Sequence, residues 1–166
     1  GWIQNINFMF LGGCLFVFAL GIPAYFKEGR AARSGHIILK IIAVGYFLSS
    51  FFTTDPASMF DNQQSIPGVI HGILGALVFS LSPVCCFVFW RRFRVDKDWG
   101  YMQAWTWIAG VVMVITIVLM KIGQLQPGLL HDWAGLVQRG SLIIFYVWIV
   151  TFALGLKRSD KKSRHG

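Results

Sequence analysis

The chain has 166 residues, of which 55% are hydrophobic and 16% aromatic, and its mean hydropathy is +0.61. Charged residues make up only 13%, far below the roughly 25% of soluble domains, so the composition excludes an ordinary soluble globular protein. The formal net charge of +8 comes without a nucleic-acid-binding motif. We therefore attribute the basic residues to membrane topology and to contacts with anionic lipid headgroups, and we expect no nucleic-acid partner.

Five apolar segments follow one another along the chain, each close to the ~20 residues that a helix needs to cross ~30 Å of hydrocarbon. They cover residues 5–26, 37–54, 67–90, 104–120 and 135–156. Membrane-spanning strands would be about half as long and would alternate apolar with polar residues. The pattern predicts an all-α integral membrane protein, a single domain of five transmembrane helices in a compact bundle, with a basic cytoplasmic tail at residues 157–166.

The first segment has no basic region before it and no small-residue cleavage site, so we expect no cleavable signal peptide. The chain begins with Gly1 rather than Met. Either an initiator methionine has been removed, or the sequence is part of a longer protein.

The basic residues indicate an orientation. Thirteen of the fifteen Lys and Arg lie in three groups, at residues 27–40, 91–97 and 157–164. These groups fall at alternate ends of a five-helix path, so the positive-inside rule places all three in the cytoplasm. We predict a multi-pass protein of the inner (plasma) membrane with its N-terminus outside and its C-terminus in the cytoplasm.

The third segment contains small residues spaced by three and four positions in "GVIHGILGA", a pattern that lets helices approach closely in lipid. The helical period places His71 on the same side as Gly68 and Gly75, so we expect this histidine to face protein rather than lipid. Pro83 lies inside the same segment and predicts a kink.

Metal and disulfide chemistry has little support in the sequence. Cys14, Cys85 and Cys86 lie in apolar segments without the spacing of metal ligands, and their number is odd. We predict neither a disulfide nor a metal site at these cysteines, and no cofactor apart from a possible bound lipid.

Polar residues gather at the predicted outer face. Asp55 ends the second segment, His71 opens the third, and Arg139 lies near the outer start of the fifth. By helix length, Arg139 is about one turn inside the apolar span, where a charge needs a partner or water. Its candidate partners are Asp55, Asp132 and a lipid phosphate, while interfacial snorkelling is the structural alternative.

Three stretches, "FFTTDPAS", "IPGVIHGILGALVF" and "GLVQRGSLIIFYVWIVTFALGL", resemble in order and spacing the bacterial and archaeal membrane proteins grouped as domain of unknown function 998 (DUF998). The features shared with that family are an acid ending one helix (Asp55), a His-Gly pair opening the next (His71) and a Gly-Leu-x-x-Arg run opening the last (Arg139). Gln138 departs from the family's usual Glu, and family members usually carry one more helix before the first segment. The resemblance implies no activity.

We expect a non-enzymatic membrane component that binds lipid or an anionic ligand through Arg139, His71 and Asp55. One alternative is an accessory or structural subunit of a larger membrane complex. Another is an intramembrane zinc-dependent lipid hydrolase similar to ceramidases, which would need His131 to fold inward and join His71 and Asp55, with Asp61 and Ser49 or Ser50 as further possible companions. Haem would require two facing histidines, for which His71 and His131 are the candidates.

Overall fold

The computed structural model describes residues 2–26, 29–55, 64–125 and 129–165. For residues 124, 129–132, 134 and 160–165 it describes the backbone alone. These ranges form five α-helices and a short 3-10 helix, η2 (Gly100–Met102). The α-helices are α1 (Trp2–Tyr25), α2 (Arg30–Ser49), α3 (Ile66–Phe93), α4 (Gln103–Leu125) and α5 (Leu129–His165). Each contains a stretch long and apolar enough to cross a membrane. The predicted all-α fold with five membrane-spanning helices is confirmed.

Several helices continue past the apolar segments from which they were predicted. α2 begins among basic residues at Arg30, and α5 runs through the basic stretch after residue 156 to His165. Hydropathy marks only the part of a helix that lies in hydrocarbon, whereas Arg and Lys are good helix formers outside it.

The chain divides into two compact units, Gly1–Leu81 (unit 1) and Ser82–Gly166 (unit 2). α3 contributes its first part to unit 1 and its second part to unit 2, and the helix passes without interruption through Pro83. The kink at Pro83 stays a prediction.

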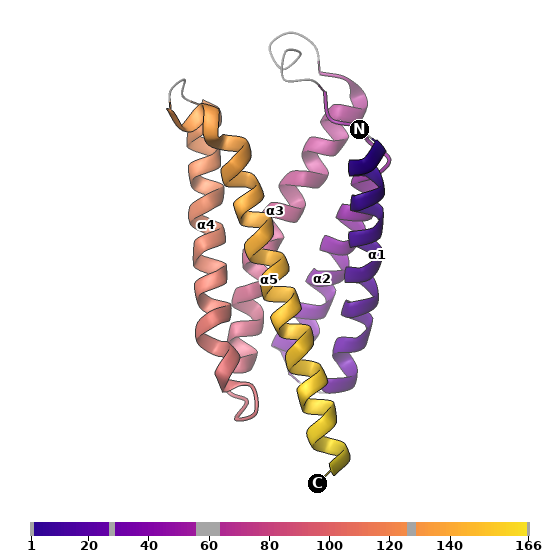
Figure 1. The fold of residues 1–166 in the computed structure, drawn as a ribbon, viewed down its shortest axis with the longest axis vertical. Coiled ribbons are helices and arrows are strands. Elements are labelled where there is room, and N and C mark those ends of the chain that lie inside the picture. The colour runs from indigo at the N-terminus through magenta and orange to yellow at the C-terminus, as the bar shows by residue number, and fades with distance from the viewer. Residues whose placement is uncertain (1, 27–28, 56–63, 126–128, 166) are drawn as a thin grey trace. The chain divides into compact units, whose positions relative to one another are not determined.

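Unit 1 is built on α1 packed along α2, and Figure 1 shows the two helices side by side. Gly12 makes their close approach possible, because a Cβ there would lie 2.7 Å from the backbone nitrogen of Phe47 and 2.8 Å from the carbonyl oxygen of Ala43. Small residues at a contact allow such backbone approach between helices in lipid. Leu15 and Ile42 are buried side chains of this unit.

Unit 2 is built on α4 packed along α5, also side by side in Figure 1, together with the second part of α3. Its core contains a cluster of buried rings in mutual contact: Phe89, Phe93, Trp99, Phe145, Trp148 and Phe152. The indole of Trp148 donates to the Thr106 hydroxyl at 3.0 Å, and the indole of Trp105 donates to Thr151 at 3.0 Å. These bonds satisfy the polar edge of each indole within an otherwise apolar interface.

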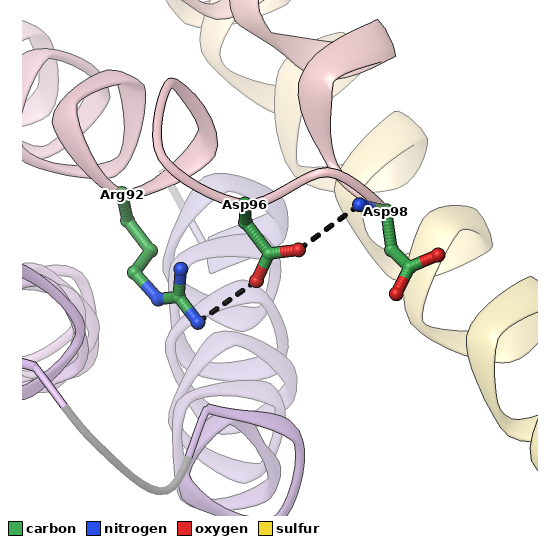
Figure 2. A network of polar contacts seen from close by, with 3 residues as sticks. All are labelled: Arg92, Asp96 and Asp98. Atoms are coloured by element: carbon green, nitrogen blue, oxygen red, sulfur yellow. Dashed lines mark hydrogen bonds and ion pairs between the residues drawn. The ribbon is translucent and has the colours of Figure 1, made fainter.

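The connection between α3 and α4 is held by a short polar network, shown in Figure 2. The Arg92 guanidinium forms an ion pair with Asp96 at 2.8 Å, and the other carboxylate oxygen of Asp96 accepts the backbone N–H of Asp98 at 3.1 Å. Arg94 lies over the Trp90 ring at 4.7 Å. The basic residues of this connection therefore also have local structural roles besides the topological one.

Candidate functional site

Asp55 follows α2 in unit 1 and is hydrogen-bonded to Ser65, the residue that precedes α3. Its Oδ2 accepts the backbone N–H of Ser65 at 2.9 Å, and its Oδ1 accepts the Ser65 hydroxyl at 2.6 Å. The Ser65 hydroxyl oxygen in turn accepts the backbone N–H of Gly68 at 3.1 Å. Ser65 immediately precedes α3 and is its N-cap, while Asp55 adds a negative charge at the same helix end, where the helix dipole favours it.

Gly68 leaves the space in which the Asp55 carboxylate lies. A Cβ at Gly68 would collide with Oδ2 and Cγ of Asp55, whereas a Cβ at Gly72 would meet nothing within 4 Å. The two glycines therefore differ in function although they belong to the same small-residue pattern. A glycine is required at position 68 because the Asp55 carboxylate, which is bonded to the N-cap residue Ser65, occupies the space that a side chain would need.

His71 joins the start of α3 to the end of α2. Its Nδ1 lies 2.8 Å from the carbonyl oxygen of Phe52, and its ring lies 5.9 Å from the ring of Phe8 on α1. Because a carbonyl only accepts hydrogen bonds, Nδ1 carries the proton in this contact. The prediction that His71 faces protein is confirmed, and Nε2 is the ring nitrogen that remains for another group.

Arg139 lies on an exposed apolar face of α5 in unit 2. It is itself exposed, as are its neighbours one turn away on the same side, Leu136 (55% exposed) and Ile143 (61% exposed). The face continues toward the C-terminus through further exposed residues, Val147, Val150 and Leu154. In the part of the chain that the structure describes, no side chain forms an ion pair with Arg139. A guanidinium thus interrupts an apolar face within the candidate membrane span Gly135–Ser159.

The three predicted site residues are divided between the two units. Asp55 and His71 both belong to the α2–α3 junction of unit 1, whereas Arg139 belongs to unit 2. That Arg139 joins the other two in one cluster stays a prediction. Asp61 and the side chains of His131 and Asp132 lie outside the described residues.

A further feature of unit 1 is an apolar groove of about 240 Å³ on α2 and α3. Lys40 is the charged residue in its lining. The sequence carried a signal for it, because Lys40 lies three residues inside the predicted apolar segment 37–54. From the sequence, we placed Lys40 in the cytoplasmic group of basic residues. We did not predict that Lys40 lies among apolar side chains of α2 and α3.

Among the described side chains, no three His, Cys, Asp or Glu residues come together in a way that could hold a metal ion. Asp55 is bonded to Ser65 and His71 to the carbonyl oxygen of Phe52, so both side chains join the end of α2 to the start of α3. The hydrolase and haem alternatives both depend on His131, outside the described side chains.

Five apolar helices with polar groups at the helix ends define a multi-pass helical membrane protein. The chain belongs to the family described as "protein of unknown function (DUF998)", whose model matches residues 1–155. The family resemblance seen in the sequence is thereby confirmed. No curated protein and no solved structure matches the chain.

Proposed function

We propose that this protein is a non-enzymatic component of a prokaryotic plasma membrane that binds the headgroup of an anionic lipid through Arg139. The observation that carries the proposal is the guanidinium on the exposed apolar face of α5, beside Leu136 and Ile143. In a membrane, this face is covered by hydrocarbon or by another helix. A charge there needs a counter-charge at its own depth, and a lipid phosphate near the membrane surface supplies one.

The α2–α3 junction suits a binding or scaffolding role better than a catalytic one. Both oxygens of Asp55 already accept hydrogen bonds from Ser65, so this acid is a poor candidate for a general base. His71 uses Nδ1 to hold Phe52 and offers Nε2 as its remaining hydrogen-bonding atom. We propose that His71 adds one hydrogen bond to a bound polar group, and that Asp55 acts through the geometry of the junction.

Replacing Arg139 with Gln tests the proposal. A charge-assisted hydrogen bond contributes about 1.5–3 kcal/mol, so the variant should bind anionic lipid roughly tenfold or more weakly. Native mass spectrometry of the full chain, titrated with phosphatidylglycerol in a mild detergent, measures the change. Arg139→Lys should retain much of the binding, because it keeps the charge while losing the planar fork.

Arg91→Gln provides the charge-matched control. Arg91 is exposed near the end of α3, outside the proposed site, and this substitution should leave binding unchanged. Equal lipid binding by Arg139→Gln and the unmodified protein would contradict the proposal. If gentle extraction instead recovers a protein partner that Arg139→Gln releases, the accessory-subunit alternative is the correct one.

A further inference from the structure

The surface of the groove of unit 1 is almost wholly apolar, and Lys40 contributes the aliphatic stem of its side chain to the lining. The groove is lined by residues of α2 and α3: Lys40, Ile41, Val44, Gly45, Leu48, Leu74 and Leu77. At Gly45 the helices approach so closely that an added Cβ would lie 2.7 Å from Cγ2 of Val78. The glycine therefore brings α2 and α3 together at this level.

Lys40 has no counter-charge in the described part of unit 1. Asp55 is the carboxylate there, and it lies beyond the C-terminal end of α2 with both oxygens bonded to Ser65. The lysine is half-buried, and no described side chain forms an ion pair with it. An ionisable group within an apolar segment is expected to face a polar partner, and a lipid phosphate can supply one.

The dimensions of the groove select among partners. From Lys40 to Leu48 the helix rises about 12 Å, which approaches the ~15 Å depth of one lipid leaflet. Its volume of about 240 Å³ is below the roughly 300 Å³ at which pockets for whole small molecules begin. A transmembrane helix is about 10 Å wide and does not fit into such a space. A single hydrocarbon chain does.

We infer that this groove binds one anionic phospholipid, with the Lys40 ammonium on its phosphate and one acyl chain along Val44, Leu48 and Leu77. A phospholipid complements the groove, because it has a negative phosphate to place near the Lys40 ammonium and hydrocarbon to place along the apolar lining. The site is separate from Arg139 and belongs to unit 1 alone. It therefore stands or falls independently of the function proposed above.

Two substitutions in the groove test the inference by native mass spectrometry of the full chain with phosphatidylglycerol or phosphatidylcholine. Lys40→Gln should weaken phosphatidylglycerol binding about fivefold, the contribution of one basic residue near anionic lipid, and leave phosphatidylcholine binding unchanged. Leu77→Trp fills the groove and should weaken binding of both lipids. Arg139→Gln should leave this binding step intact, so that the unmodified protein shows two binding steps for anionic lipid and each of the two charge variants weakens a different one.

Matched controls lie on the same two helices. Arg33→Gln removes an exposed charge from α2 outside the groove, and Ile73→Trp adds a ring to an exposed position of α3 outside it, and both should bind lipid as the unmodified protein does. The inference is overturned if Lys40→Gln keeps full phosphatidylglycerol binding, or if Leu77→Trp leaves binding of both lipids unchanged. Dissociation of a dimer by Leu77→Trp, with no change in bound lipid, would also overturn it and assign the groove to a second copy of the chain.

Discussion

At the start of α3 three residues depend on one another: Asp55, Ser65 and Gly68. Ser65 caps α3 through the Gly68 N–H, Asp55 fixes Ser65 through two hydrogen bonds, and Gly68 leaves room for the Asp55 carboxylate. Asp55, which the sequence predicted as part of a ligand-binding site, thus holds the start of a helix. Its cost in an apolar protein is offset by the two hydrogen bonds and by the helix dipole.

Gly68→Ala should displace the Asp55 carboxylate and weaken this junction. The loss of the cap and of hydrogen bonds of about 1 kcal/mol each outweighs the gain in helix propensity, so we expect a destabilisation of about 1–2 kcal/mol. Unfolding followed by circular dichroism in detergent measures it.

Gly72→Ala is the control for that experiment, four residues further along α3. Its Cβ would enter open space, so the substitution should be neutral or should stabilise the helix by about 0.5–1 kcal/mol. Equal stability of the two alanine variants would show that the Asp55 carboxylate does not depend on the space at Gly68.

At the scale of elements, the packing of α1 against α2 includes a close backbone approach at Gly12. Gly12 is buried and lies against the backbone of α2, while its neighbour Gly13 is exposed with nothing within 4 Å of an added Cβ. Lipid supplies no hydrophobic drive for helix association, so close van der Waals contact of this kind carries much of the stability.

Gly12→Ala should therefore push α1 and α2 apart. The added methyl group would meet backbone atoms of Phe47 and Ala43, which cannot move aside as a flexible side chain would, so we expect a loss of about 1–3 kcal/mol. Gly13→Ala, one position away, should have no such effect. Unfolding by titration with sodium dodecyl sulfate compares the two, and a Gly12→Ala variant as stable as Gly13→Ala would refute the close contact.

At the scale of the whole molecule, the distribution of basic residues predicts how the chain lies in the membrane. With the N-terminus outside and five spans, the connection after α4 is outside and the end of α5 is inside. Alkaline phosphatase fused after Leu125 should then be active. The same enzyme fused after Gly166 should be inactive, whereas green fluorescent protein at that position should fluoresce. The reverse pattern would contradict the orientation.

The sequence by itself was sufficient for the five helices and for the family. Crossing a membrane depends on the summed transfer free energy of contiguous residues, and that sum can be read along the chain without knowing any contact. The helical period likewise placed His71 on a protein-facing side, as the contacts with Phe8 and Phe52 confirm.

Only the tertiary structure decided how the polar side chains are used. The bonds of Asp55 to Ser65 and of His71 to Phe52 join residues 10 and 19 positions apart, and such pairs depend on the path of the connection between α2 and α3. Gly12 and Gly13 look alike in the sequence, yet only Gly12 lies against α2. In the sequence, Lys40 is one of several basic residues that indicate the topology, whereas in the structure it lines a groove between α2 and α3. Hydropathy is a property of each segment alone, whereas a hydrogen bond, a close contact or a groove requires two segments to be placed together.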